Sequence, residues 1–357
     1  MTSNDICLKE LGERKIIDDL IKNRFPKVAD NFDDATIVLK EQIIGDLAIT
    51  TDPCPKPVAN ILFGENMYLY GKMTVIINVS DLAAMGAKPL GIVLSTVMQN
   101  NMKVEDYKRY LDGVEEACNE YDCPLLGGNI KDGSEFSSTG TALGTFIGNK
   151  HLKRSGAKIG DFVCVIGNMG MFWAAVAVYM EKISLSEDEM SILNDALFNP
   201  KAKLKEGLLL AKHQGVNSCM DSSDGITACL NEISKASNKK IIIDESFLTF
   251  DPLLEKIASL INADIKNLMF SWGGWELVCT VENEHLLSLK NEIEKLGTSF
   301  QVIGYVDEGS TGVFYKTTST VSKVNDNLVS ERFNITSMFS YGLEPYLNIL
   351  KCSRFSR

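Results

Sequence analysis

The stretch that most constrains this chain is NVSDLAAMGAKP, residues 78–89, because it places one carboxylate, Asp81, between two apolar segments. Residues 73–79 are rich in β-branched side chains and predict a buried strand, whereas residues 82–87 favour a helix. Asp81 is therefore expected at a strand-to-helix junction, where it could face a ligand. The alternative is that Asp81 only caps the helix, a role worth about 1 kcal/mol.

Further acidic and hydroxyl side chains stand where predicted elements begin or end. A site that gathers several carboxylates needs divalent cations or raised pKa values, because like charges repel. Oxygen ligands of this kind suit Mg²⁺, which commonly binds through carboxylates and substrate phosphates. The pattern therefore indicates nucleotide chemistry. The side chains are Asp33, Asp34, Thr50, Thr51, Asp52, Asp221, Ser223 and Asp224.

Length and composition set outer limits on function. A chain of 357 residues is long enough for two domains of roughly 150 residues each. No apolar run approaches the ~20 residues of a membrane span, and residues 1–15 have no signal-peptide core. We therefore expect a cytoplasmic protein without a membrane partner. The net charge of −11 gives no support to nucleic-acid binding, and it means that a bound triphosphate would need metal ions.

Cysteine and histidine usage favours none of the common nucleophilic or zinc sites. The nine cysteines are scattered without a CxxC pair, so neither a disulfide framework nor a zinc site is expected. Cys54 stands between two prolines beside Asp52, and we favour a loop-filling role over a nucleophilic one. The three histidines, at positions 151, 213 and 285, suggest no serine-histidine-acid arrangement.

Hydrophobic patterning predicts an α/β chain of the sandwich type, because strands and helices alternate without a clean βαβ repeat. No Walker loop is found, since GK(S/T) is missing. Residues 127–133 are expected to form a loop in which Lys131 and Asp132 face either phosphate or solvent, and we favour solvent. Residues 315–357 carry little signal. Helices are expected from Ile16 to Ile21, after 170 through Met180, and at 104–120, 187–195, 200–213, 225–236 and 284–296; strands are expected at 36–40, 46–51, 73–79, 91–97, 139–147, 162–166, 240–243, 276–281 and 301–306.

Seven motifs in order resemble the superfamily of thiamine-monophosphate kinase, aminoimidazole ribonucleotide synthetase, selenophosphate synthetase and a hydrogenase-maturation dehydratase. The kinase is the most similar member, and the spacing holds over nearly the whole chain. The motifs are GER (12–14), DDA (33–35), TTD (50–52), NVSDLAAMGA (78–87), LLGG (125–128), RSGAKIGD (154–161) and DSSDG (221–225).

The resemblance implies an α/β (α+β) fold of two domains, residues 1–153 for ATP, Mg²⁺ and dimerisation and residues 154–357 as a synthetase-like domain. It further implies a homodimer, with ATP in an acidic cleft between the domains and in-line transfer of the γ-phosphoryl group. By residue matching, Asp81, Asp221 and Asp224 would be catalytic, and Arg154, Ser223 and Asn129 would contact the nucleotide. The implied metal ligands are Asp34, Thr50, Thr51, Asp52, Asp81, Asp221 and Asp224.

Several positions depart from the kinase pattern. Asn129 replaces the aspartate of GGD, although its carbonyl oxygen could still bind a metal ion. Gly273 and Gly274 replace the acidic pair of GGEDYEL, which lies near the substrate of the kinase. Residues 53–57, PCPKP, replace the stretch that leads to a substrate-side histidine. The catalytic half of the pattern is kept and the acceptor half is altered.

The sequence thus predicts an ATP- and Mg²⁺-dependent phosphotransferase that resembles the thiamine-monophosphate kinase of thiamine biosynthesis. Its small-molecule acceptor need not be thiamine monophosphate, because the acceptor half of the pattern is altered. Phosphoryl transfer can be catalysed mainly by positioning and charge stabilisation, which suits a site rich in carboxylates. Two alternatives stay open. One is an ATP-dependent ligase or dehydratase of the same superfamily that activates an amide or carbonyl group. The other is a nucleotide-binding protein that has lost turnover.

Overall fold

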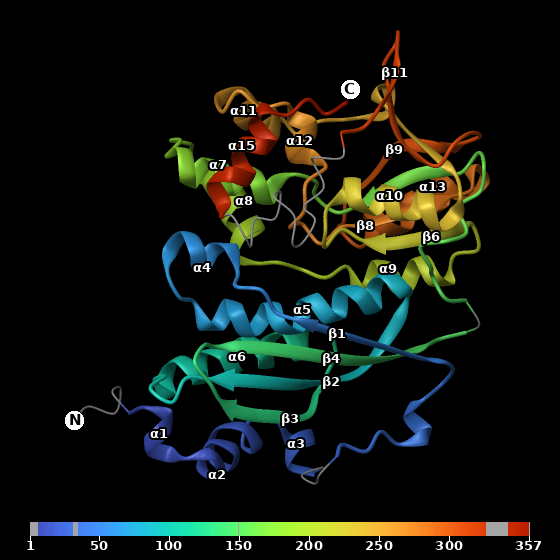
Figure 1. Ribbon diagram of the computed structural model, residues 1–357. Helices are drawn as coiled ribbons and strands as arrows, with labels where there is room; N and C mark the ends of the chain where they lie inside the picture. The colour runs from blue at the N-terminus through green and yellow to red at the C-terminus, as the bar shows by residue number, and fades with distance from the viewer. Residues whose placement is uncertain (1–5, 31–34, 149, 326–341, 357) are drawn as a thin grey trace. The chain divides into compact units, whose positions relative to one another are not determined.

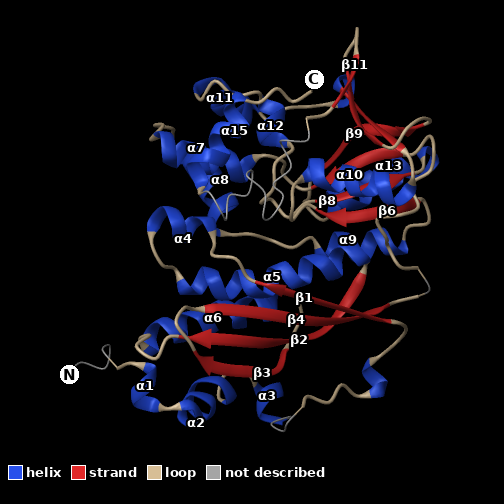
Figure 2. Ribbon diagram, viewed as in Figure 1, coloured by secondary structure: helices blue, strands red, loops and turns tan. Residues whose placement is uncertain are grey.

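The computed structural model describes residues 6–30, 35–148, 150–325 and 342–356. These divide into two compact units, one made of residues 1–82 and 87–150 and the other of residues 83–86 and 151–357. Helices and strands alternate in both units (Figures 1 and 2), as the mixed α/β expectation requires. Among the described residues, no helix is long and apolar enough to cross a membrane.

The first unit is built on a four-stranded mixed sheet in the order β1-β4-β2-β3. β2 runs parallel to β3 and antiparallel to β4, and β4 runs antiparallel to β1. Helices α5 and α6 cover one face of this sheet, and the N-terminal helices lie along its β3 edge (Figure 1). The elements are α1 (Leu8–Leu11), α2 (Glu13–Lys15), η1 (Ile16–Lys22), α3 (Pro26–Asp30), η2 (Lys40–Gln42), β1 (Leu47–Pro53), α4 (Val58–Phe63), α5 (Met67–Met85), β2 (Ala87–Met98), α6 (Val104–Glu120), β3 (Leu125–Asp132) and β4 (Ser137–Phe146).

The strand expected at residues 73–79 is wrong, because these residues form the middle of the 19-residue helix α5. This helix is buried on nearly all sides, including polar residues such as Thr74 and Ser80, both fully buried. A helix that is apolar all round shows no 3.6-residue period, so its β-branched residues resemble a strand. Asp81 therefore lies near the C-terminal end of a helix and not at a strand-to-helix junction.

Two other expectations in the first unit are wrong. Residues 127–133 are not a loop, because Gly127 to Asp132 belong to β3, which pairs with β2. Backbone pairing with β2 outweighs the loop propensity of Gly, Asn and Asp at these positions. Residues 36–40 form no strand, and the last of them, Lys40, begins η2.

The second unit is built on a seven-stranded mixed sheet in the order β11-β10-β7-β9-β5-β8-β6. Its core packs α9 and α13 against β5, β6 and β8. The tail contributes more than its weak signal indicated, namely β10, β11 and α15. The elements are β5 (Phe162–Ile166), α7 (Met171–Glu181), α8 (Glu187–Phe198), α9 (Leu204–Lys212), β6 (Val216–Asp221), α10 (Ile226–Ser237), β7 (Lys240–Asp244), η3 (Glu245–Phe247), α11 (Pro252–Leu260), α12 (Ile265–Met269), β8 (Leu277–Val281), α13 (Asn283–Lys295), β9 (Phe300–Asp307), β10 (Gly312–Lys316), β11 (Val321–Lys323) and α15 (Leu343–Cys352).

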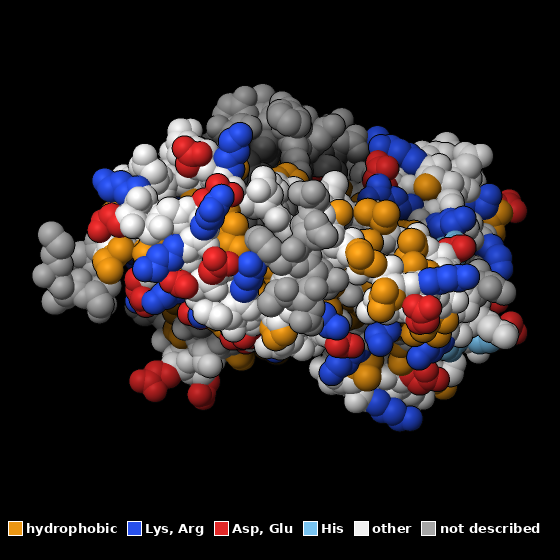
Figure 3. Space-filling model, turned by 90° about the horizontal axis from the view of Figure 1, so that it is seen from below, with side chains coloured by type: hydrophobic (Ala, Val, Ile, Leu, Met, Phe, Trp, Pro, Cys, Tyr) orange, Lys and Arg blue, Asp and Glu red, His pale blue; other side chains and the backbone are white. Residues whose placement is uncertain are grey.

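Basic and acidic side chains are interspersed on the face of the molecule that Figure 3 shows. Among the described residues visible there, neither sign of charge covers a continuous area. This face therefore lacks the basic stripe that is typical of proteins that bind a phosphate backbone.

Two glycines let the backbones of α5 and α6 touch. A Cβ at Gly113 would lie 2.8 Å from the backbone nitrogen of Lys72, and a Cβ at Gly71 would lie 2.9 Å from the carbonyl carbon of Tyr110. Neither glycine therefore has room for a side chain.

We expect Gly113→Ala to destabilise the protein by about 1–3 kcal/mol, because an added methyl in a filled contact forces the helices apart. This effect opposes the gain of roughly 1 kcal/mol that alanine brings to a helix interior. Denaturant unfolding measures the difference, with the exposed Arg109→Ala in the same helix as control. Unchanged stability of Gly113→Ala would show that α6 can shift freely.

Candidate functional site

In the first unit, β1 and α5 bring four motif residues into two contacts. Thr50 Oγ1 donates a hydrogen bond to Asp81 Oδ2, and the backbone nitrogen of Asp52 donates to Asn78 Oδ1 at 3.2 Å. Asn78 and Asp81 are three residues apart on α5 and so lie on one face of the helix. The two pairs form an oxygen-rich contact between strand and helix.

The position of Asp81 excludes the capping alternative. Acidic caps stabilise the first turn of a helix, whereas Asp81 lies four residues before the last residue of α5. A negative charge near a helix C-terminus is disfavoured by the helix dipole. This carboxylate is therefore placed against a local electrostatic preference.

Asn78 was not recognised from the sequence as a site residue. It is fully buried, its Nδ2 donates to the Thr74 carbonyl at 2.9 Å, and its Oδ1 holds the backbone of Asp52. Its spacing of three residues from Asp81 was the available signal. Asn78 thereby fixes the position of β1 along the axis of α5.

The structure does not bring all first-unit candidates together. Thr51 points to the opposite sheet face from Thr50, and its hydroxyl bonds with the Gly140 carbonyl at 3.0 Å. Asn129 lies on β3, separated from β1 by β4 and β2, which corresponds to about 14 Å at the usual strand spacing. Asp34 lies outside the described residues. The nearby Thr36 Oγ1 donates to the Leu126 carbonyl at 2.8 Å.

In the second unit, the DSSDG motif forms the turn between β6 and α10. Asp221 ends β6 and is 3 % exposed, whereas Asp224 is exposed. The N-cap of α10 is Gly225, which has φ +97° and no capping side chain. Ser223 and Asp224 therefore do not cap this helix. Ser223 Oγ donates instead to Asp221 Oδ1 at 3.3 Å.

Arg154 lies in an exposed segment that is fixed by the same elements. The nitrogens of Gly156 and Ala157 each donate to Ser237 Oγ at 3.1 Å, and Cys219 N donates to the Lys153 carbonyl at 2.8 Å. Ser237 ends α10 and Cys219 lies in β6. The loop of Arg154 is thus anchored to the strand and the helix that flank the acidic turn.

Cys229 of α10 is fully buried and lies directly against this turn. Burial raises the pKa of the Cys229 thiol, and the charges of Asp221, Asp224 and Glu276 raise it further, whereas Arg154 lowers it. Cys229 Sγ itself donates to the Asp221 carbonyl at 2.9 Å. The charges that act on this thiol are therefore mainly acidic, and the guanidinium group of Arg154 acts in the opposite direction.

Glu276 and Ser222 were also missed as site residues. Ser222 Oγ donates to the Glu276 carboxylate, and burial raises the pKa of that carboxyl group. The available signal was that Glu276 is the one acid of the GGEDYEL-like segment that this chain retains. At Gly273 a side chain would overlap the ring of Phe172.

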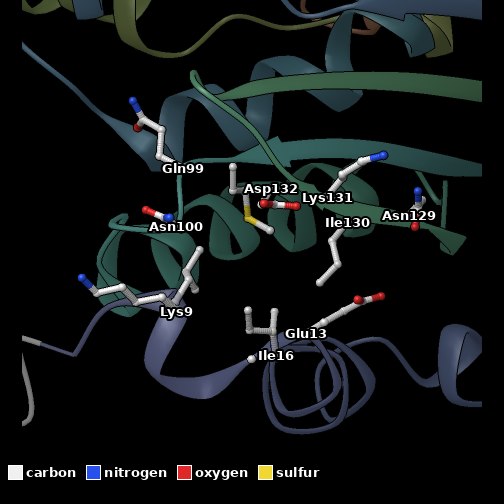
Figure 4. A pocket seen from close by; sticks show the side chains of 12 residues that line it. Lys9, Glu13, Ile16, Gln99, Asn100, Asn129, Ile130, Lys131 and Asp132 are labelled. Atoms are coloured by element: carbon white, nitrogen blue, oxygen red, sulfur yellow. The ribbon is translucent and has the colours of Figure 1, made fainter.

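A cavity of about 450 Å³ lies between the N-terminal helices and the ends of β2 and β3. Figure 4 shows Glu13 and Ile16 from the N-terminal helices facing Ile130 of β3, with Asn129 at the side of the cavity. Lys131 and Asp132, expected in solvent, are exposed and line this cavity. The full lining comprises Leu8, Lys9, Gly12, Glu13, Ile16, Met98, Gln99, Asn100, Asn129, Ile130, Lys131 and Asp132.

Cys54 has the properties of a loop-filling residue. It is 6 % exposed, and burial raises the pKa of its thiol to about 12. The thiol is therefore protonated at neutral pH, which is unsuited to nucleophilic attack.

If Asp81 holds Mg²⁺ as the sequence predicts, Asp81→Asn should weaken Mg²⁺-dependent ATP binding by roughly tenfold or more, because a neutral amide replaces a charged carboxylate. Titration calorimetry with an ATP analogue, with and without Mg²⁺, measures the change. Asp46→Asn, at a position just before β1, is the matched control. Near-normal binding by Asp81→Asn would remove Asp81 from the metal site.

Comparison with known proteins identifies the family. The model of the AIR synthase related protein N-terminal domain matches residues 32–146, and that of the C-terminal domain matches residues 158–316. Thiamine-monophosphate kinase of Pyrococcus horikoshii is 34 % identical over 246 residues, which cover 69 % of this chain and 74 % of the relative. The kinase of Methanocaldococcus jannaschii is 30 % identical over 315 residues, covering 84 % and 96 %.

Solved structures agree with this assignment. AaThiL complexed with AMPPCP and TMP superimposes with a TM-score of 0.65 at 25 % identity, covering 87 % of this chain and 95 % of that one. In this chain the match to the N-terminal domain model precedes the match to the C-terminal domain model. The chain belongs to the thiamine-monophosphate kinase family of ATP-dependent kinases, within the AIR synthase related proteins.

Proposed function

We propose that this protein transfers the γ-phosphoryl group of Mg²⁺-bound ATP in line to a small-molecule acceptor. The observation that carries the proposal is the pair of Thr50 and Asp81, in which a carboxylate stands near the C-terminal end of a buried helix with a hydroxyl beside it. Hard oxygen donors are the ligands that Mg²⁺ prefers. Such a site needs no covalent intermediate, because positioning and charge neutralisation suffice for phosphoryl transfer.

The roles follow from the chemistry of each side chain. The carboxylates of Asp81, Asp221 and Asp224 are the catalytic metal ligands in this proposal. Arg154 holds a phosphate through its fork of donors, Ser223 donates to another, and Asn129 offers its carbonyl oxygen. The proposed metal set is Asp34, Thr50, Asp52, Asp81, Asp221 and Asp224, and it leaves out Thr51, whose side chain lies on the opposite face of β1 from Thr50.

The cavity beside β3 suits the nucleoside of ATP. Apolar side chains such as Ile16 and Ile130 can contact the faces of a base, and the amides of Gln99 and Asn100 can bond with its edge. β3 ends the order of the four-stranded sheet, so its outer backbone edge faces the cavity and not another strand of that sheet. Asn129 would connect this cavity to the metal-bound phosphates.

The relatives are named thiamine-monophosphate kinases, and we therefore propose thiamine monophosphate as the first acceptor to test. The acceptor side of this chain is nevertheless different. Gly273 and Gly274 offer no carboxylate, and Trp272 and Trp275 flank them. These aromatic residues favour a flat acceptor that does not depend on acidic contacts at this segment.

We further propose a cytoplasmic homodimer that pairs through the first domain, residues 1–153, with residues 154–357 as the second domain. One face of the four-stranded sheet presents apolar side chains, including Leu47 at 45 % and Ile49 at 67 % exposure. Such a surface is typical of an interface. Within one chain, β4 and β2 separate Asn129 from Thr50. In this proposal the Asn129 that acts with Thr50 and Asp81 therefore comes from the partner copy.

Incubation of the protein with Mg²⁺, ATP and thiamine monophosphate should yield thiamine diphosphate and ADP, measured by chromatography. Removal of Mg²⁺ by chelation should abolish turnover. Absence of product with a preparation that binds ATP would exclude this acceptor, and ATP binding without turnover across an acceptor panel would exclude the kinase proposal.

The same assay tests the nucleoside cavity. Ile16→Trp should raise the KM for ATP by about tenfold, because the indole fills space that the base requires. The kcat at saturating ATP should change less. A KM that matches wild type would place the base elsewhere.

Mixed dimers test the shared site. Asp81→Asn and Asn129→Ala should each be nearly inactive alone, whereas co-expressed chains should recover about a quarter of wild-type turnover, because half of the dimers would contain one intact site. Recovery requires that Asn129 and Asp81 act across the interface. If mixing restores nothing although the chains associate, each protomer works by itself.

A further inference from the structure

The turn that carries Asp221 and Asp224 is fastened to the segment before β8 by three hydrogen bonds. The nitrogen of Ser222 donates to the Glu276 carbonyl at 2.9 Å, and the nitrogen of Glu276 donates to Ser222 Oγ at 2.9 Å. Ser222 Oγ in turn donates to the Glu276 carboxylate. Because Ser222 follows Asp221 directly, any movement of Ser222 displaces the acidic turn.

A carboxylate is expensive to bury at this place. Glu276 is 2 % exposed and Ser222 is fully buried. A Cβ at Gly167 would lie 2.9 Å from Glu276 Cγ and 3.2 Å from Lys203 Cε, so the lysine side chain runs beside the glutamate. An apolar side chain would often cost less in such a position. The presence of a carboxylate at this buried position therefore indicates that its hydrogen bond with Ser222 has a function.

Gly274 provides the room for this carboxylate. A Cβ at Gly274 would overlap the carboxylate of Glu276 and would lie 2.9 Å from its Oε2. The aligned residue in the kinase pattern is acidic, so a side chain there would compete for the same space. The loss of the acidic pair and the position of Glu276 are thus one linked feature of this chain.

We propose that Glu276 is a positioning residue that acts through Ser222 and holds Asp221 and Asp224 in the arrangement that binds the metal ion. This inference rests on the proposed function for the role of the aspartates. The contacts that assign this role to Glu276 are its three hydrogen bonds with Ser222. Its effect is to limit the conformations that the turn can adopt.

The test compares the Mg²⁺ dependence of variants. Ser222→Ala and Glu276→Ala should raise the Mg²⁺ concentration for half-maximal activity by about tenfold or more, as expected when a residue that orients a ligand is lost. The kcat at saturating Mg²⁺ should fall less. Glu276→Gln keeps an acceptor oxygen and should retain most of the wild-type Mg²⁺ affinity.

Gly274→Ala probes the same contact without removal of a polar group. Its methyl would displace the Glu276 carboxylate, so the Mg²⁺ requirement should rise as in Ser222→Ala. A Gly274→Ala variant with wild-type Mg²⁺ dependence would contradict the proposal.

Ser218→Ala is the matched control, because Ser218 Oγ and Thr280 Oγ1 form a buried bond of 2.8 Å between the same strands, β6 and β8. It should lower the melting temperature and leave the Mg²⁺ dependence unchanged. If Ser218→Ala and Ser222→Ala shift both quantities equally, the contact is merely structural and the proposal is overturned.

Hydrogen exchange separates this proposal from the proposed function. Without nucleotide, the amides of Ser222 and Gly225, whose nitrogens donate to Glu276 and Ser222, should exchange faster in Glu276→Ala than in wild type. Unchanged exchange would overturn the positioning role. Absence of turnover in the wild type would sink the kinase proposal and leave the exchange result to stand by itself.

Discussion

Helix α5 imposes the central constraint on the first unit, because it is buried on nearly all sides and yet contains polar residues. Asn78 is fully buried, and its amide bonds with both the helix and the backbone of β1. An amide left without partners there would cost about 1–3 kcal/mol. β1 therefore has one favourable position along the axis of α5. In this position Thr50 also reaches Asp81 and donates a hydrogen bond to it. The same position of β1 against α5 therefore produces both the apolar core and the oxygen-rich contact.

The sequence predicted those elements whose pattern is local. Residues 104–120 were expected as a helix and form α6 with these bounds, because apolar and charged residues alternate there with a helical period. Residues 73–79 failed because a helix buried all round has no polar face to reveal its period. β3 failed because its Gly, Asn and Asp residues are held by pairing with β2, which no local pattern encodes.

The candidate site shows the same division between residue identity and position. Motif spacing selected Thr50, Thr51 and Asp81, but it could not state that the two threonines point to opposite sheet faces. It also selected Asn129, but not the two strands that separate it from β1. The motif pattern does not single out Asn78 and Ser222 as site residues, because their roles are contacts with the backbone and with other side chains. Such roles depend on tertiary neighbours and have no signature of their own.

Where this chain departs from the kinase pattern at Gly273 and Gly274, other side chains occupy the space of the absent acidic pair. Gly273 has φ +109°, and the ring of Phe172 occupies the space that a side chain would need. Trp275 has φ +54°, a conformation that bulky residues adopt only when their surroundings enforce it. Burial of Trp173 and its contact with Trp272 supply that enforcement for the segment as a whole. Because this backbone path also sets the position of Glu276, a return of acidic side chains at 273 and 274 would require Phe172 and Glu276 to move together. The segment of residues 272–276 and the acidic turn are therefore linked structurally through Glu276 and Ser222.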